Sequence, residues 1–506
     1  MMWKWIGVGL YMLALVAIGV IASRRMTSVR DYYAGNKQFG FLAAAFSARA
    51  TGESAWLLLG LTGMGAMMGV QAFWVVVGEV LGVAGAWLLM CRPFKRMTDE
   101  YDSLTIPDYL ESRFQDKTQR LRKVAATCLV IFVTIYVSAQ IDATGTAFES
   151  FLGVDYYAGA LIGFAVVMAY IVSGGFVAVV WSDVFQGTLM FLGLVTLPVV
   201  ALMSIGGWGE MMTALSSIDP QLTSLSGPGG WSGIRVLEII GLSLIGLGFL
   251  GSPQIFVRFL SLKSEDEIAP GAATALVWTL LADSGAVVTG MVGRAILAPA
   301  GSSVELLGNG GQNVLPLLVE HALPAMLVGL FIAIVLSAIM STVDSLLVVA
   351  SSAAVRDWYQ QVKHPDMPDE ALVGLSRKVT FGLALASLGI ALTVAALVPG
   401  RTVFWFVIFG WSGIAATFCP TIILSLFWDR FTANGALAAM LAGFLGVPLF
   451  KFGATALPGI GQAFAALSEL PPAFLLSAIA GVLVSLADTG GSTEIQTPEG
   501  NLHRVE

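Results

Sequence analysis

The segment SARATGESAW (residues 47–56) places a cation, an anion and three hydroxyl side chains in an apolar run from Phe41 to Val70. Each charge at the centre of a bilayer costs about 3 kcal/mol on insertion scales, so Arg49 and Glu53 indicate a functional site. The glycine and the β-branched threonine in this segment disfavour a helix, which predicts an interruption there. An interruption frees carbonyl oxygens that lipid cannot satisfy but that a bound sodium ion can.

A second apolar run, LFIAIVLSAIMSTVDSLLVVASS (330–352), carries five polar side chains within nine positions, namely Ser337, Ser341, Thr342, Asp344 and Ser345. Hydroxyls on adjacent residues point about 100° apart on a helix, so they converge only partly on one ion. Sodium, as a hard cation, prefers such oxygen ligands. A single serine would simply bond back to the preceding turn, but this density favours an ion site.

Other charges fall within apolar runs, and their roles stay open. Glu79, Asp283 and Arg294 have few polar neighbours in sequence, so pairs that merely lock helices together explain them as well as a site does. Arg49 could pair with Glu53, pair with Glu79, or attract a substrate carboxylate. Four positions separate Arg49 from Glu53, which places both on one face of an intact helix.

The elements that must position these residues are membrane spans. Of 506 residues, 57% are hydrophobic and only 12% are charged, about half the charged fraction of a soluble domain. Runs of 18 or more apolar residues are long enough to cross ~30 Å of hydrocarbon. We therefore expect an all-α polytopic membrane protein with about 13 transmembrane helices, at 5–22, 41–69, 72–91, 124–150, 157–174, 183–203, 236–260, 270–298, 323–350, 379–398, 402–427, 434–451 and 472–487.

The distribution of lysine and arginine predicts the orientation. With the N-terminus outside, 20 of the 26 basic residues fall on cytoplasmic loops, including 91–123 and the region of Arg258, and four fall outside. The stretches 205–234 and 299–320 are then external loops. We expect a multi-pass protein of the inner (plasma) membrane, with the N-terminus outside and the C-terminus cytoplasmic.

Enzymatic chemistry is not indicated. The three cysteines and three histidines are scattered without ligand spacing, so neither a disulfide framework nor a metal site is expected. No nucleophile–base set is visible, and no signalling domain follows the last span, which disfavours a sensor. The expected partners are a small solute, sodium and the lipid bilayer, and not nucleic acid. The oligomeric state stays open.

Seven stretches, in order along nearly the whole chain, resemble the sodium/solute symporter family, most closely its bacterial sodium/proline symporters. They are SARATGESAW and LSAIMSTVDSLL, together with LTIPDYLESRFQDKTQRLR, FVTIYVSAQIDA, SGGFVAVVWSDVFQGTLM, GLGFLGSPQIFVRFL and the stretch 411–440.

The resemblance implies a LeuT-type 5+5 inverted-repeat core with broken helices. The transport core would span 41–427, with one repeat at about 41–203 and the other at about 236–427. Residues 1–40 would form the first span and a cytoplasmic loop, 428–488 peripheral spans, and 489–506 a cytoplasmic tail.

The resemblance also implies the ion sites. Sodium would be held by the backbone carbonyls of Ala50, Glu53 and Ala338 and by the hydroxyls of Ser341 and Thr342. A possible second sodium would involve Asp183 and Ser345.

For the solute, the match to the proline carriers is incomplete. Those carriers have an aspartate at the position of Gly52 and a methionine at Glu53, so a carboxylate has moved by one residue. In the expected span 236–260, a tryptophan and a tyrosine of those carriers are replaced by Ile245 and Phe249. Fewer large aromatic side chains are then available to surround the solute. The expected substrate-binding residues are Glu53, Trp56, Tyr136, Gln140, Phe249 and Pro253.

We therefore predict a sodium-coupled secondary transporter that imports a small organic solute, most plausibly proline or another amino acid, by alternating access. Sodium is the one ion or cofactor expected. Two alternatives remain: a proton-coupled carrier using Glu53 or Asp142, and a sodium symporter for a solute that is not an amino acid.

Overall fold

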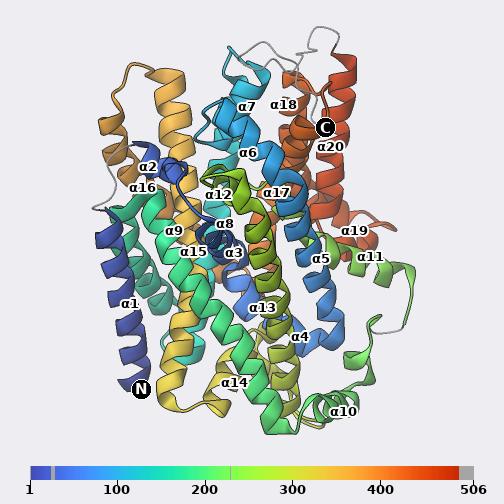
Figure 1. Ribbon diagram of the computed structural model, residues 1–506. Coiled ribbons are helices and arrows are strands. Elements are labelled where there is room, and N and C mark those ends of the chain that lie inside the picture. The colour runs from blue at the N-terminus through green and yellow to red at the C-terminus, as the bar shows by residue number, and fades with distance from the viewer. Residues whose placement is uncertain (1, 24–28, 228–229, 489–506) are drawn as a thin grey trace.

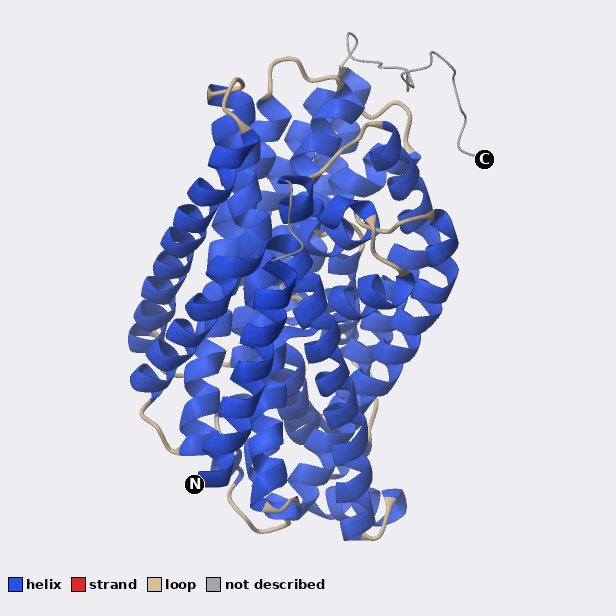
Figure 2. Ribbon diagram, turned by 60° about the vertical axis from the view of Figure 1, so that its left-hand side comes forward, coloured by secondary structure: helices blue, strands red, loops and turns tan. Residues whose placement is uncertain are grey.

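Long apolar segments in a bilayer form helices because a helix satisfies every backbone polar group without water. The computed structural model describes residues 2–23, 29–227 and 230–488, and that part of the chain is helical, with one isolated β-bridge between Phe39 and Leu262 and no strand. Figure 2 shows the helices packed side by side, with many of the connecting loops at the two ends. The predicted tail at 489–506 lies outside the described residues.

The α-helices run as follows: α1 Met2–Ser23, α2 Val29–Ala34, α3 Phe41–Ala55, α4 Thr62–Met68, α5 Phe73–Ala84, α6 Cys91–Glu100, α7 Ile106–Phe114, α8 Arg120–Leu152, α9 Tyr156–Ile205, α10 Trp208–Ile218, α11 Gly233–Ser243, α12 Pro253–Leu260, α13 Ile268–Leu297, α14 Val314–Ala322, α15 Ala325–Ser352, α16 Asp369–Leu397, α17 Val403–Phe427, α18 Ala433–Pro448, α19 Gly461–Leu467 and α20 Leu470–Ala487. Short or irregular helices join them: η1 Gly35–Lys37, η2 Trp56–Leu61, η3 Gly69–Ala72, η4 Gly85–Met90, η5 Pro220–Thr223, η6 Leu244–Phe249, η7 Glu265–Glu267, η8 Val304–Leu307, η9 Asn309–Gly311, η10 Ala353–Lys363, η11 Leu449–Gly453 and η12 Ala454–Ala456.

Eleven helical segments of the described residues are long and apolar enough to cross a membrane. The all-helical membrane fold is confirmed, whereas the described residues contain 11 such segments and not the expected 13. One segment, Phe41–Glu100, is 60 residues long and covers two expected spans, and the start of span 157–174 falls in a shorter apolar helix, Tyr156–Met168.

Burial separates a core from a lipid-facing periphery. In Ala325–Lys363 and Val403–Phe427, 83% of the most apolar window is buried, against 28% in Met2–Ala22 and Leu470–Ala487. Peripheral helices expose large side chains such as Leu13, at 68%, because hydrocarbon solvates them. The polar residues of α3 and α15 therefore lie in the protein interior and not against lipid.

The two ends of the bundle carry the loops that were expected on opposite sides. In Figure 1, α6 and α7 lie at the upper end, whereas α10, α14 and the start of α1 lie at the lower end. The predicted cytoplasmic loop 91–123 and the predicted external loops 205–234 and 299–320 are therefore at opposite ends.

Two spans are broken in the middle. In α3, Ser54 has φ 31° and ψ −164°, so the helix is interrupted within the predicted segment. The second break separates α11 and η6 from α12 at Gly251, which has φ 151°. A Cβ at Gly251 would lie 2.8 Å from Cα of Cys419 in α17, so both the conformation and the space require glycine there.

Candidate functional site

The interruption of α3 redirects its backbone hydrogen bonds. In a continuous helix, the N–H of Ala55 would donate to the carbonyl of Thr51. Here it donates to Oε1 of Gln140 at 3.1 Å, and the N–H of Trp56 donates to the carbonyl of Glu53. The carbonyl of Gly52 instead accepts the Trp56 indole N–H at 3.0 Å. Carbonyl oxygens around the break are thus available to other groups.

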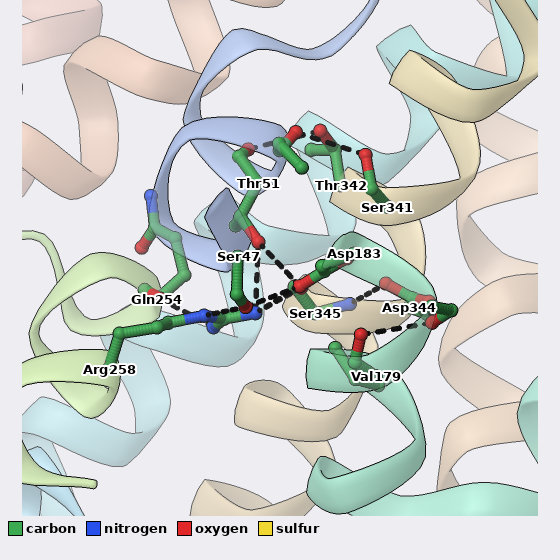
Figure 3. Close-up of polar contacts among 12 residues, drawn as sticks. Ser47, Thr51, Val179, Asp183, Gln254, Arg258, Ser341, Thr342, Asp344 and Ser345 are labelled. Atoms are coloured by element: carbon green, nitrogen blue, oxygen red, sulfur yellow. Dashed lines mark hydrogen bonds and ion pairs between the residues drawn. The ribbon is translucent and has the colours of Figure 1, made fainter. Parts of the chain in front are cut away.

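Two of these oxygens face α15. The hydroxyl of Ser341 donates to the carbonyl of Ala50, and the hydroxyl of Thr342 donates to the carbonyl of Thr51, each at 3.0 Å. Both hydroxyls also lie within 3.2 Å of the carbonyl of Ala338. Figure 3 shows the two side chains pointing from α15 toward the break. Five oxygen atoms, all neutral and buried, therefore converge between the two helices.

Four of the five residues expected to hold sodium meet in this place: Ala50, Ala338, Ser341 and Thr342. The carbonyl of Glu53 is engaged by the N–H of Trp56, and Thr51 supplies the carbonyl that faces Thr342.

Next to this cluster, Asp183 of α9 forms a buried ion pair with Arg258 of α12. Nη2 of Arg258 lies 3.0 Å from Oδ2 of Asp183 and 2.9 Å from the hydroxyl of Thr51, and it also donates to Ser345. Ser47 donates to the same carboxylate oxygen at 2.6 Å. Figure 3 shows Arg258 reaching across from α12 to these groups. A guanidinium therefore already contacts the Asp183 and Ser345 oxygens considered for a second sodium.

The sequence interpretation missed this role of Arg258, because it counted the residue among the cytoplasmic charges. The side chain is fully buried. The signal that was available is its position in the apolar stretch IFVRFL, five residues after Pro253.

The solute-binding residues predicted on α3 and α8 surround the break. Tyr136 OH lies 3.5 Å and Gln140 Nε2 3.3 Å from the hydroxyl of Ser54, the residue at the break. The indole of Trp56 packs edge-on against Phe404 at 6.1 Å between ring centroids. These polar and aromatic groups are buried together, where the end of α3 meets the middle of α8.

Phe249 joins this group from the second broken span. Its ring fills the space beside Gly52, where a Cβ would lie 2.8 Å from Phe249 Cε1. The sequence interpretation did not single out Trp411 of α17. Its ring centroid lies 5.0 Å from that of Phe249, in a tilted arrangement, and 6.4 Å from that of Tyr136, edge to face. Its indole N–H donates to the carbonyl of Ile245 at 3.0 Å. Trp411 thus places an aromatic ring beside Ile245, the position at which the proline carriers have a tryptophan.

Three other predicted residues lie elsewhere. Pro253 lines a small cavity of about 20 Å³ with Val257 and Val348. Asp142 accepts from Arg401 at 2.8 Å in a polar cavity of about 240 Å³ near the end of α8. The carboxylate of Glu53 lies near Glu79 of α5 and Asp283 of α13.

There, Glu53 meets three of the charges whose roles the sequence left open. Arg49 forms an ion pair with Glu53 and lies 3.9 Å from Glu79. Carboxylate oxygens of Glu53, Glu79 and Asp283 all lie within 4.8 Å of one another, and all three residues are buried. Arg294, by contrast, lies outside this cluster and is half-buried near the end of α13.

The fold has known counterparts. A sialic acid symporter coupled to sodium, solved in an outward-open state, superposes with a TM-score of 0.79 over 97% of this chain and 98% of its own, at 19% identity. A nucleobase–cation symporter, Mhp1, in a closed conformation superposes with a TM-score of 0.52 over 90% and 93% of the two chains, at 13% identity. This likeness supports the predicted LeuT-type fold.

Sequence relatives agree. The high-affinity proline transporter PutP of Bacillus subtilis is 36% identical over 430 residues, which are 85% of this chain and 88% of the relative. The sodium/proline symporter of Escherichia coli is 31% identical over 489 residues, which are 96% and 93%. The sequence pattern of the Sodium:solute symporter family matches residues 32–443.

Broken membrane helices that gather buried oxygen atoms are how secondary transporters build their sites, and together with the family and the relatives they define a secondary transporter. The chain belongs to the sodium:solute symporter family. The predicted family is confirmed, and the protein is a multi-pass protein of the inner (plasma) membrane.

Proposed function

We propose that this protein couples the inward movement of sodium to the import of proline. The observation that carries the proposal is the meeting of the Ala50 and Thr51 carbonyls with the Ser341 and Thr342 hydroxyls at the break of α3. A sodium ion at this position would replace the two interhelical hydrogen bonds and tie α3 to α15. The curated relatives that transport proline support the choice of solute.

The ion would act on the solute site through α3 itself. The same break that presents these carbonyls also presents Ser54 to Tyr136 and Gln140. Ordering the break by sodium would thus fix the groups expected to bind solute. Each ligand then raises affinity for the other by the same factor, typically 5- to 150-fold.

The solute would lie among Trp56, Tyr136, Gln140 and Phe249, with Trp411 as an additional wall. Glu53 and Pro253 were also expected at this site. They would act on it indirectly, Glu53 from its group with Arg49, Glu79 and Asp283, and Pro253 from the start of α12. The transport core would be residues 41–427, and alternating access would come from movement of its two repeats, 41–203 and 236–427.

For the second sodium, Arg258 is the competing group. As long as its guanidinium pairs with Asp183, sodium could reach Asp183 and Ser345 only after Arg258 moved. We therefore propose that Arg258 provides the positive charge at this position and that the coupling ion binds at Ala50 and Ser341. The N-terminus would lie outside and the C-terminus in the cytoplasm, as the basic residues indicate.

The test is uptake of labelled proline, other amino acids and organic acids by purified protein in liposomes. Proline uptake that requires an inward sodium gradient supports the proposal. Uptake driven equally by a proton gradient without sodium would contradict it, and sodium-driven uptake of an organic acid but not of proline would contradict the choice of solute.

A further inference from the structure

A group of four charged residues lies between α3, α5 and α13, and the proposed function assigns no ion to it. Glu53, Glu79 and Asp283 come from these three different helices, and their carboxylate oxygens lie within 4.8 Å of one another. All are at most 1% exposed. Arg49 is the basic member, paired with Glu53 and 3.9 Å from Glu79.

One guanidinium stands against three carboxylates in this group. If all three carboxylates are ionised, two negative charges are in excess among buried atoms, and either protons or a cation must neutralise them. The remaining contacts of Arg49 are aromatic rings, with its guanidinium carbon 4.7 Å from the centroid of Phe249 and 5.6 Å from that of Trp278. Excess charge in a low-dielectric interior is strongly unfavourable unless a counter-ion is present.

Asp283 supplies the independent indication of a ligand. Both of its carboxylate oxygens are fully buried, and within the described part of the chain neither has a hydrogen-bond or ion-pair partner. Buried carboxylates in native proteins are normally paired or bind a cation. One oxygen of Asp283 lies within 4.8 Å of an oxygen of Glu53 and of Glu79, so an ion between the three residues would give this carboxylate a partner.

The ligand set indicates the kind of ion. Three carboxylates provide up to six oxygen atoms, which suits a hard cation. A separation of up to 4.8 Å between ligand atoms leaves room for a small ion at ordinary bonding distance from each. The site is anionic, in contrast to the neutral oxygens at Ala50 and Ser341.

We propose that Glu53, Glu79 and Asp283 form a second sodium site, separate from the one between α3 and α15. This inference rests on the proposed function for the identity of the ion. Glu53 lies three residues after Ala50, so the two sites flank the same interrupted segment of α3. Occupation of either would order the break, which predicts that the two ions bind cooperatively.

The test is saturation binding of radioactive sodium to the purified full-length protein. We expect two ions per wild-type chain, and one fewer in Asp283→Asn and in Glu79→Gln, which keep side-chain volume. The matched control is Glu469→Gln, which removes a buried carboxylate paired with Lys451 in the peripheral helices. The control should bind as wild type does.

The inference is overturned if both Asp283→Asn and Glu79→Gln bind as much sodium as wild type. Protons would then neutralise the cluster or, if only Asp183→Asn loses the second ion, that ion would bind at Asp183. Failure of the proposed function looks different, because Ser341→Ala/Thr342→Ala would then keep the wild-type amount of sodium. Folding of the two cluster variants is verified by the ion they retain at Ser341.

Discussion

The hydroxyl of Ser341 lies 3.0 Å from the carbonyl oxygen of Ala50, although 291 positions separate the two residues. This contact joins the break of α3 to the middle of α15. Beside it, the Thr51 carbonyl that faces Thr342 is not used by the N–H of Ala55, which donates to Gln140 instead. The interruption of α3 thus removes a helical hydrogen bond next to the proposed ion site.

The pair of Arg258 and Asp183 predicts a large effect on stability. Removing one member of a buried ion pair leaves an unpaired charge and typically costs about 3–5 kcal/mol. We expect Arg258→Ala and Asp183→Asn each to lower the unfolding temperature strongly, and the double variant to lose less than the sum of both. Thermal unfolding of purified protein in detergent measures this cycle, and additive effects would show that the two residues are not coupled.

Gly52 and Phe249 predict a steric effect. A Cβ at Gly52 would lie 2.8 Å from the Phe249 ring, and overpacking of this kind costs about 1–3 kcal/mol. Gly52→Ala should therefore destabilise the protein, and less so when Phe249 is replaced by Leu. The control is Gly9→Ala in α1, where no atom lies within 4 Å of the added Cβ. Equal destabilisation by Gly52→Ala in both backgrounds would sink this explanation.

The contacts of Asp142 lead to a prediction about the proton-coupled alternative. The carboxylate pairs with Arg401 and Tyr156 beside the polar cavity. Asp142 is two residues after Gln140, so its side chain leaves α8 on the opposite side. We expect Asp142→Asn to keep the sodium concentration for half-maximal uptake within about threefold of wild type, a change under 1 kcal/mol. Uptake against sodium concentration tests this, and loss of sodium dependence in the variant would favour the alternative.

Asp108 of α7 predicts a pH effect outside the membrane spans. Burial raises the pKa of Asp108, but the guanidinium groups of Arg356 and Arg122 outweigh it and hold that pKa below its ordinary value. A lowered pKa in the folded state contributes stability that is complete above about pH 4, the unfolded value, and is lost as the pH falls through the folded value. Unfolding temperatures measured from pH 6 to pH 3 should fall more steeply in wild type than in Asp108→Asn. Parallel curves would contradict the prediction.

Part of this site could be predicted from the sequence. Hydroxyls at 341 and 342 and a glycine beside two charges at 49–53 are conspicuous in apolar runs, because hydrocarbon tolerates them only for a reason. The helix period then limits which of them can point the same way. These local signals were sufficient to predict the break of α3 and a polar site on α15, whereas the pairing of the two segments came from the family resemblance.

Other features depend on tertiary packing and have no local signal. Glu79 and Asp283 are more than 200 positions apart, so only the packing of α5 against α13 shows that they meet. Arg258 follows an apolar stretch near the end of a span, where a basic residue usually marks the cytoplasmic side. The apolar stretch around it is a weak signal of burial, but its partners Asp183 and Thr51 lie on two other helices and cannot be identified from its own segment.

The central claim is that the carbonyls at the break of α3 and the hydroxyls of α15 hold the coupling sodium ion. The most direct measurement is sodium-dependent uptake of labelled proline by liposomes containing wild type or Ser341→Ala/Thr342→Ala. The claim predicts that the variant needs at least about tenfold more sodium for half-maximal uptake, equivalent to about 1.4 kcal/mol. An unchanged sodium requirement in a folded, active variant would contradict it.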